Sequence, residues 1–188
     1  MTRIISGRFR GRRLTVPDGT DIRPTTDRMR ERLFSMLGHG RYPALAGARV
    51  ADLFAGTGAL GIEALSRGAA HVTFVEQARG SLACLRTNIE TVKSEANETT
   101  IIALDAAAVS CAEQPFDFIF LDPPYRKGLV LPTLNRLLEM NWVHGETAII
   151  CELASDDPVE VPEGLCIVDD RKQGQQRILI LSKQASAQ

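Results

Sequence analysis

The segment Leu121-Asp122-Pro123-Pro124-Tyr125 holds the residue types in this chain that are best suited to chemistry. It ends the apolar run 116–121, which is short enough to be one buried strand, and open α/β sheets bind ligands at that end of a strand. Proline has no N–H, so the segment presents two acceptors, the Asp122 carboxylate and the Pro123 carbonyl, which suit a planar NH2 group. Tyr125 adds a ring on which a flat base could stack. The sequence therefore predicts an aromatic amine as substrate, with Asp122, Pro123, Pro124 and Tyr125 as the candidate catalytic residues.

The same residues also make an ordinary stiff turn, because proline and aspartate both favour turns. Taken alone, the motif leaves the structural and the catalytic interpretation open. A second motif upstream favours the catalytic one.

This second motif is a glycine-rich loop at residues 52–61, Asp-Leu-Phe-Ala-Gly-Thr-Gly-Ala-Leu-Gly. It joins a predicted strand to a predicted helix, which is the context in which Gly-x-Gly-x-x-Gly binds a nucleotide-like cofactor. Gly56 and Gly58 let the backbone turn sharply and approach a ligand closely. Glu76 ends the next predicted strand, at about the distance where an acidic residue meets ribose hydroxyls, and Asp105 ends the third.

Two kinds of cofactor fit such a loop. A dinucleotide would place its pyrophosphate at the helix N-terminus, whereas an adenosyl sulfonium compound has no phosphate and carries positive charge. A rim of carboxylates from Asp52, Glu76 and Asp105 suits the cation better. These acids also weigh against the alternative that the glycines only allow a helix and a strand to pack.

Strands and helices alternate from residue 47 onward, which predicts an α/β fold with a mostly parallel, doubly wound sheet of seven strands. The predicted strands span 49–54, 71–76, 99–104, 116–121, 147–153, 165–169 and 177–182. The last two have no helix between them and predict an antiparallel hairpin. The predicted helices span 59–67, 79–93 and 129–140, and a short alanine-rich helix ends near residue 113. Glu152, at the end of its strand, is a further candidate for lining the pocket.

The N-terminal part predicts a small basic unit of a hairpin and a helix. Residues 3–16 alternate loosely around two glycines, and a helix begins near Asp27 with Thr25 or Thr26 as its cap. Its predicted apolar stripe consists of Met29, Leu33, Met36 and Leu37, and Arg28, Arg30 and Arg32 are expected mostly outside that stripe. We expect two units, an arm at residues 1–41 and a main domain at residues 47–183.

Charge is distributed unevenly between these two units. The net charge is -1, yet residues 1–41 contain ten arginines, no lysine and four acidic residues, a net of +6, and the rest of the chain has a net of -7. A basic arm on an acidic body predicts contact with a polyanion, and arginine favours phosphate forks and base stacking. The alternative is an ordinary solvated surface. The candidate RNA-binding residues are Arg8, Arg10, Arg12, Arg13 and Arg28.

Composition and cysteine spacing restrict the protein class. No apolar run approaches the roughly 18 residues of a membrane span, and the N-terminus lacks a signal-peptide core, so we expect a cytoplasmic protein that contacts no membrane. The four cysteines lack a Cys-x-x-Cys spacing, so we expect no metal site and interpret each cysteine as a small buried hydrophobic residue.

The two motifs resemble the signatures of S-adenosylmethionine-dependent amino-group methyltransferases of Rossmann-like class I fold. The segment Arg23-Pro24-Thr25-Thr26-Asp27, with the residues up to Phe34, narrows this to a resemblance with the RsmD family. Members of that family methylate the exocyclic N2 amine of one guanine in small-subunit (16S) ribosomal RNA. Residues 4–7 and 11–14 are also typical of the family, and the similarity runs from about residue 1 to 183. The family pattern departs at Gln173, where an aromatic residue is expected before the glycine of the last hairpin.

The resemblance implies a role for each motif residue. The methionine part of S-adenosylmethionine would contact Asp52, Phe54, Ala55, Gly56, Thr57, Gly58 and Ala59. Glu76 would take the ribose hydroxyls, and Asp105 with Ala106 would lie by the adenine. Asp122, Pro123 and Tyr125 would receive the flipped guanine. Apart from the resemblance, Arg28 and Thr26 are expected over the cofactor, because their helix precedes the glycine-rich loop. The expected partner is 16S ribosomal RNA in a small-subunit particle, and we expect a monomer.

Three other interpretations stay open at this point. A DNA adenine-N6 methyltransferase shares the Asp-Pro-Pro-Tyr motif, although no segment beyond the arm could read sequence in a duplex. A non-catalytic RNA-binding protein would need no intact Asp122, Pro123 and Tyr125. A dehydrogenase is the weakest, because the terminal antiparallel hairpin points away from it.

Overall fold

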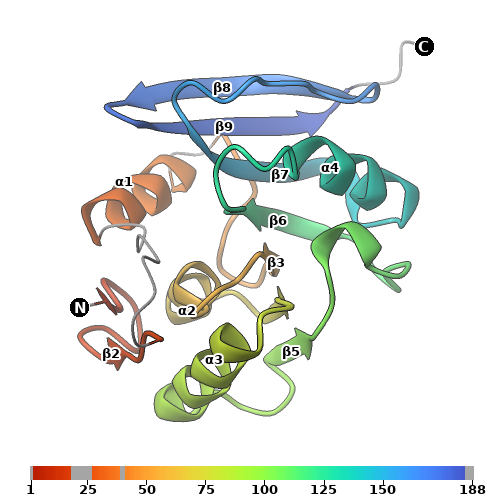
Figure 1. The fold of residues 1–188 in the computed structure, drawn as a ribbon. Coiled ribbons are helices and arrows are strands. Elements are labelled where there is room, and N and C mark those ends of the chain that lie inside the picture. The colour runs from red at the N-terminus through yellow and green to blue at the C-terminus, as the bar shows by residue number, and fades with distance from the viewer. Residues whose placement is uncertain (1, 18–26, 39–40, 185–188) are drawn as a thin grey trace.

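A computed structural model of the chain describes residues 2–17, 27–38 and 41–184. The main sheet has seven strands in the order β5-β4-β3-β6-β7-β9-β8 (Figure 1). These are β3 (Arg49–Leu53), β4 (His71–Val75), β5 (Thr99–Ile102), β6 (Phe116–Leu121), β7 (Val143–Ala154), β8 (Leu165–Gln173) and β9 (Gln176–Lys183). Strands β3 to β7 are parallel, and β9 is antiparallel to both of its neighbours, β7 and β8. The predicted fold class and terminal hairpin are therefore confirmed.

Successive strand residues point to opposite faces of the sheet. Both faces carry apolar side chains, and helices cover both of them. The helices are α1 (Asp27–Leu37), α2 (Ala59–Ser66), α3 (Arg79–Val92) and α4 (Val130–Glu139), with the short 3-10 helix η1 (Ala106–Ala108). In β6, Phe118 and Phe120 pack with α1, α2 and α3 in one core cluster, whereas Ile119 and Leu121 pack with α4 in a second cluster. The result is a three-layer sandwich (Figure 1).

The chain changes winding direction between β3 and β6, which are neighbours in the sheet although β4 and β5 lie between them in sequence. In the register of this pair, Leu53 is opposite Leu121. Phe54 and Asp122 therefore emerge side by side, and the Asp122 N–H lies 3.4 Å from the Leu53 carbonyl oxygen. Such a switch point opens a crevice at the carboxyl ends of the strands, where α/β proteins bind ligands.

The N-terminal hairpin consists of two short antiparallel strands, β1 (Thr2–Arg3) and β2 (Arg13–Leu14). Its apolar side chains Ile4, Phe9 and Leu14 are buried in the same core cluster as α1 and α2. Gly7 has a φ of 81°, and a Cβ atom at this position would lie 1.8 Å from the Ser66 carbonyl oxygen. The hairpin thus sits directly on the C-terminal end of α2.

Polar contacts fix this docking. The buried Glu63 carboxylate accepts the backbone N–H groups of Ile5 and Ser6 at 2.8 and 3.0 Å. Asn88 of α3 exchanges two hydrogen bonds with the backbone of Thr15 and also donates to the Thr57 carbonyl at 2.9 Å. One buried amide therefore joins the end of the hairpin to the glycine-rich loop.

Several local predictions differ from the structure. Arg30 was expected outside the apolar stripe of α1, yet it is fully buried, and the buried positions are Arg30, Leu33, Phe34 and Leu37. Its guanidinium donates to the Arg3 carbonyl and to Asp27, both at 2.7 Å, so the docked hairpin supplies the partner that makes burial possible. The predicted caps Thr25 and Thr26 lie outside the described residues.

Two further expectations were wrong near residue 110. The predicted alanine-rich helix is only the three-residue η1. Asp105 caps its N-terminus, and the chain is irregular from the end of η1 to β6. All four cysteines were expected to be buried, but Cys111 lies exposed in that irregular stretch and Cys84 and Cys166 are partly exposed. Only Cys151, in the interior strand β7, is fully buried.

Candidate functional site

The glycine-rich loop leaves the end of β3 in a tight left-handed path. Phe54, Gly56 and Gly58 have φ values of 59°, 56° and 79°. A Cβ atom on Gly58 would come within 2.4 Å of the Leu85 side chain, so this glycine is required by packing as well as by its backbone conformation. Gly61 likewise lies against the ring of Phe74 and allows α2 to approach β4 closely.

Two acidic residues hold this loop in place. Asp52 is almost fully buried, and its Oδ2 accepts the Gly61 N–H at 2.8 Å. Glu76, just after β4, accepts the Gly56 N–H at 2.8 Å with Oε2. The other oxygen of Glu76 accepts the N–H groups of Gln77 and Ala78. The two carboxylates therefore define the shape of the loop before any ligand binds.

Burial raises the pKa of Asp52 to about 7. The hydrogen bond from Gly61 opposes this rise, and the neighbouring charge of Glu76 adds to it. A carboxyl group with such a pKa is poised between its neutral and charged forms near neutral pH. It would gain charge when a cation binds close by.

The Asp-Pro-Pro-Tyr segment lies at the end of β6, beside this loop. Pro123 is buried, Pro124 is exposed, and Asp122 and Tyr125 are partly exposed. The chain reverses at Arg126, which has a φ of 59° and pairs with Asp156 at 2.9 Å. The reversal leaves the aspartate and the tyrosine on the wall of a common cavity.

Tyr125 is held by a residue pair from the C-terminal strands. Its hydroxyl donates to Glu152 Oε1 of β7 at 3.0 Å, and the same oxygen accepts from Gln176 Nε2 of β9 at 3.0 Å. Burial raises the pKa of Tyr125, and the charge and hydrogen bond of Glu152 raise it further. The tyrosine therefore stays neutral, with its ring fixed in one orientation.

A cavity of about 560 Å³ lies between the two motifs, a size typical of small-molecule sites. Its lining includes the predicted residues Asp52, Phe54, Ala55, Gly56, Thr57, Ala59, Glu76, Ala106, Asp122, Pro123, Pro124, Tyr125 and Glu152. Of the residues predicted for the cofactor, Gly58 and Asp105 are not in this lining. Gly58 packs beneath the loop, and the Asp105 carboxylate accepts the Ala107 N–H at 2.9 Å as the cap of η1.

Other lining residues have no motif that would identify them. Gln77, Ala78 and Ser81 follow Glu76, and Leu104 and Leu129 supply apolar walls. Val16 also lines the cavity and is 43% exposed, so the end of the N-terminal hairpin reaches the site. Asn88, which is 73 positions along the chain from Thr15, bonds the Thr15 backbone and so holds the neighbouring Val16 beside the cavity. An exposed valine next to a proline gave no sequence signal for this role.

The candidate RNA-binding arginines divide into two groups. Arg8 pairs with Glu98 at 2.5 Å, and Arg12 donates to the Thr91 carbonyl at 2.7 Å, with both guanidinium groups over the Phe9 ring. Arg10, Arg13 and Arg28 are exposed. Arg28 was expected near the cofactor, yet it does not line the cavity between the two motifs and lines hollows beside α1 instead. The first two arginines therefore also attach the hairpin to the body.

Two absences concern only the described parts of the chain. Within residues 2–17, 27–38 and 41–184, no group of three histidine, cysteine or acidic residues is arranged to hold a metal ion. The helices in those ranges also include none long and apolar enough to cross a membrane.

Comparisons with known proteins agree with this geometry. The family model described as "Conserved hypothetical protein 95" matches residues 2–182. The ribosomal RNA small subunit methyltransferase D of Escherichia coli K12 is 41% identical over 150 residues, which are 80% of this chain and 73% of that protein. The Haemophilus influenzae protein of the same name is 35% identical over 177 residues, which are 92% of this chain and 89% of that protein.

Solved methyltransferase structures share this fold. A putative methyltransferase, yhhF from Escherichia coli, superimposes with a TM-score of 0.84 at 35% identity and covers 98% of this chain and 99% of that one. A magnesium protoporphyrin IX methyltransferase from Synechocystis, solved with bound SAM, has a TM-score of 0.63 at 16% identity, covers 84% of this chain and 79% of that one, and shows a shared fold alone. The chain belongs to the Conserved hypothetical protein 95 family, which is the RsmD family of ribosomal RNA methyltransferases.

Proposed function

We propose that this chain transfers a methyl group from S-adenosylmethionine to the exocyclic N2 amine of one guanine in 16S ribosomal RNA. The observation that carries the proposal is the shared cavity, in which the Asp-Pro-Pro-Tyr segment of β6 faces the glycine-rich loop of β3. The names of the relatives support ribosomal RNA of the small subunit as substrate.

The residues of the cavity suit this cofactor. S-adenosylmethionine supplies an electrophilic methyl group on a positively charged sulfur atom. The buried Asp52, whose raised pKa falls when a cation approaches, and the Glu76 carboxylate give the loop the negative charge that such a cation needs. Leu104 and Ala106 provide apolar walls for an adenine ring, and Glu76 lies where ribose hydroxyls are expected.

The exocyclic amine of guanine is a poor nucleophile, because its lone pair is delocalised into the ring. The Asp122 carboxylate and the Pro123 carbonyl accept its two N–H bonds, which turns the nitrogen toward tetrahedral geometry and frees the lone pair. Tyr125, fixed by Glu152, supports the base by stacking. Asp122 is partly exposed and can pass the released proton to solvent. Positioning provides most of the remaining acceleration.

The guanine must leave its stack to reach this cavity, which costs a few kcal/mol in a duplex. In this proposal Arg10, Arg13 and Arg28 bind flanking phosphates and offset that cost, because phosphate contacts dominate the affinity of such complexes. Residues 1–41 would then serve as the RNA-contacting arm and residues 47–183 as the methyltransferase domain.

The test is a methylation assay with radiolabelled S-adenosylmethionine. The substrates are small-subunit particles and free 16S RNA from a strain that lacks its own enzyme of this family, together with naked DNA. We expect label in ribosomal RNA and its recovery as N2-methylguanosine after digestion to nucleosides. Label in DNA adenine would establish the DNA methyltransferase instead. A chain that binds RNA and takes up no cofactor in a calorimetric titration would be a non-catalytic RNA-binding protein.

A further inference from the structure

A basic groove separates α1 from the β8–β9 hairpin, on the side of the molecule where Figure 1 shows α1 next to the hairpin turn. The larger part of the groove has a volume of about 750 Å³, and a second part has a volume of about 550 Å³. Both parts and a third, small hollow are lined by Arg32, and we call the three together the α1–hairpin groove.

The described lining of the groove has an excess of positive charge. It contains five basic residues, Arg28, Arg32, Arg41, Arg171 and Lys172, and two acidic ones, Glu31 and Asp169. Asp169 is paired with Arg171 at 2.9 Å, and Arg32 donates to the neutral side-chain amide of Gln173. Neither contact removes the excess of three positive charges, and a polyanion is therefore the ligand that the groove favours.

The groove also carries groups that suit unpaired bases. Met29 and Met36 give it partly exposed apolar surface, and the side-chain amides of Gln173 and Gln176, which also bond Arg32 and Glu152, add polar groups. Bases that are splayed out of a helix use such apolar surfaces and hydrogen-bonding edges, whereas the bases of a paired duplex are hidden. The combination indicates single-stranded RNA rather than duplex.

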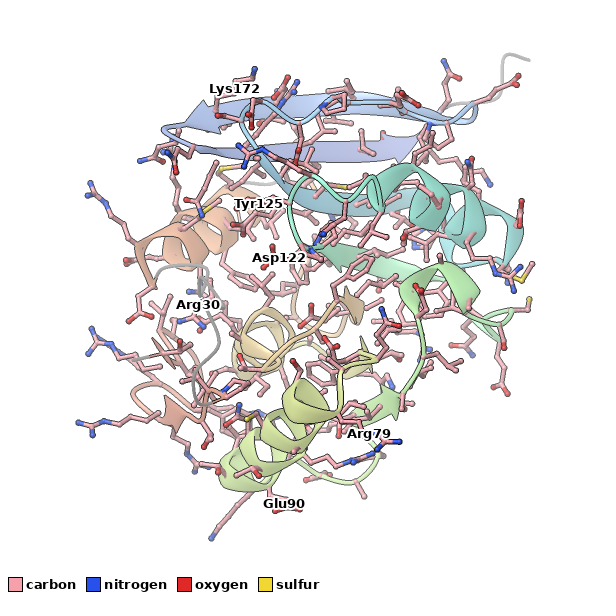
Figure 2. The ribbon with its side chains drawn as sticks, in the orientation of Figure 1. Arg30, Arg79, Glu90, Asp122, Tyr125 and Lys172 are labelled. Carbon is pink, nitrogen blue, oxygen red and sulfur yellow. The ribbon has the colours of Figure 1, made fainter. Side chains whose placement is uncertain are left out.

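A chain of contacts connects the groove to the catalytic cavity. Gln176 lines the groove and donates to Glu152, and Glu152 in turn accepts the Tyr125 hydroxyl. Both Glu152 and Tyr125 line the cavity between the two motifs. Figure 2 shows Lys172, Tyr125 and Asp122 in succession from the hairpin down to the end of β6. A strand in the groove would therefore lie next to the base that enters the cavity.

We propose that the α1–hairpin groove binds the single-stranded RNA that flanks the target nucleotide, with Arg28 of α1 and Arg171 of β8, which line the same part of the groove, as phosphate contacts. This inference rests on the proposed function for its substrate and extends the RNA-contacting surface from the N-terminal arm to the C-terminal hairpin. At the hairpin turn, Gln173 contributes a side-chain amide whose oxygen accepts a hydrogen bond from Arg32.

The test uses the double variant Arg28→Ala with Arg171→Ala, which removes one cation from each wall of the larger part of the groove. Neither position is buried, and the structural contact between Arg32 and Gln173 is left intact. The charge-matched control is Arg86→Ala with Lys183→Ala, which removes exposed cations from α3 and from the far end of the same hairpin. Thermal unfolding and calorimetric S-adenosylmethionine binding are measured for both, and both should match the wild-type chain.

Binding to a single-stranded RNA oligonucleotide is measured as a function of salt. The double variant should lower the log–log salt slope by about 1.4, since each phosphate contact contributes about 0.7 for a single strand, and the control should leave the slope unchanged. With ribosomal substrate, the groove variant should raise KM severalfold and leave kcat nearly unchanged. Duplex RNA should bind more weakly than the single strand to the wild-type chain.

The outcomes separate the two proposals. If the wild-type chain methylates no ribosomal RNA, the proposed function fails, and oligonucleotide binding still judges the groove. If the groove variant has the same salt slope and KM as the control, the groove does not bind RNA. A loss of kcat without a change in KM would also overturn the groove, because it would indicate that α1 only supports the catalytic cavity.

Discussion

At the scale of single residues, the candidate site depends on two carboxylates with different environments. Asp122 is partly exposed at the end of β6, whereas Asp52 is buried beneath the loop, where ionisation is costly. The two strand ends that carry them are neighbours in the sheet. One aspartate is thus suited to the substrate amine and the other to a cation.

The first prediction concerns Asp122. Asp122→Ala should lower kcat by about 10² to 10³, the usual cost of removing one preorganised polar group from a reacting centre, and should barely change cofactor affinity. Single-turnover methylation and calorimetry measure the two effects. The control is Glu139→Gln, a carboxylate at the end of α4 that is 64% exposed and does not line the cavity. Wild-type turnover in Asp122→Ala would remove the aspartate from the mechanism.

The second prediction concerns the ionisation of Asp52. Its pKa of about 7 in the folded chain is above the ordinary value of 3.8, so the folded state binds the proton more tightly than the unfolded state. The contribution of Asp52 to the free energy of unfolding is therefore greatest below pH 4. It falls as the pH rises to about 7, by roughly 4 kcal/mol at most.

The variant Asp52→Asn tests that linkage. Asparagine can still accept the Gly61 N–H but cannot ionise, so its stability relative to wild type should improve between pH 5 and pH 8. Urea unfolding at both pH values measures the change. The control Asp156→Asn, at an exposed carboxylate whose pKa is lowered by Arg126, should show no such improvement. A pH-independent difference between Asp52→Asn and wild type would mean that Asp52 is ionised in the fold throughout.

At this scale, the sequence predicted most of the residues that line the cavity, because both motifs are local and each follows a recognisable strand. Glu152 was also correctly expected to line it. Val16 and Asn88 were not predictable, since their roles depend on contacts between segments about 73 residues apart. Spacing alone does not reveal where the end of a short hairpin will lie.

At the scale of elements, the N-terminal hairpin is attached by backbone geometry. Gly7 and Gly11 have nearly the same φ, 81° and 82°, but differ in their surroundings. The Cβ of an alanine at Gly7 would overlap the Ser66 carbonyl, whereas nothing lies within 4 Å of the corresponding position at Gly11. Comparing the same substitution at the two glycines therefore separates the cost of backbone strain from the cost of displacing the hairpin from α2.

The third prediction uses this pair. Gly11→Ala should lower the free energy of unfolding by about 1 kcal/mol, the strain of a left-handed residue. Gly7→Ala should cost at least about 3 kcal/mol more, because the hairpin must shift and expose apolar side chains that are each worth about 1.5–3 kcal/mol. Urea unfolding measures both. Equal losses in the two variants would show that the contact with α2 contributes nothing.

Element positions were predictable where hydrophobic periodicity was clear, as in β6, whose bounds Phe116–Leu121 match the prediction. They were less predictable where tertiary contacts decide. Arg30 is buried because the docked hairpin offers the Arg3 carbonyl, a partner that the helix sequence does not reveal. The β8–β9 turn is also tighter than predicted, since only Gly174 and Gln175 remain outside the strands.

At the scale of the whole molecule, the two core clusters share one sheet. Ile4, Phe9 and Leu14 belong to the cluster on one face, and the single tryptophan, Trp142, belongs to the cluster on the other. The strands between them contribute alternate residues to both. A substitution that destabilises the core cluster on one face should therefore also destabilise the cluster on the other face.

The fourth prediction follows from this shared sheet. Trp142 fluorescence and far-UV circular dichroism should report the same urea midpoint, as expected for a cooperative domain. Gly7→Ala should shift both midpoints equally, although Gly7 and Trp142 lie on opposite faces. If the tryptophan transition stays at its wild-type midpoint in that variant, residues 1–41 fold independently of the body.

The outer strand β8 has a second consequence. It forms one edge of the sheet, and an uncovered edge can recruit strands from other molecules, which charged side chains discourage. The charges on this edge include Arg171 and Lys172, which also line the α1–hairpin groove. If the groove binds RNA as proposed, a relative that lost these charges would risk self-aggregation together with weaker RNA binding, so one substitution on this strand would change both solubility and substrate affinity.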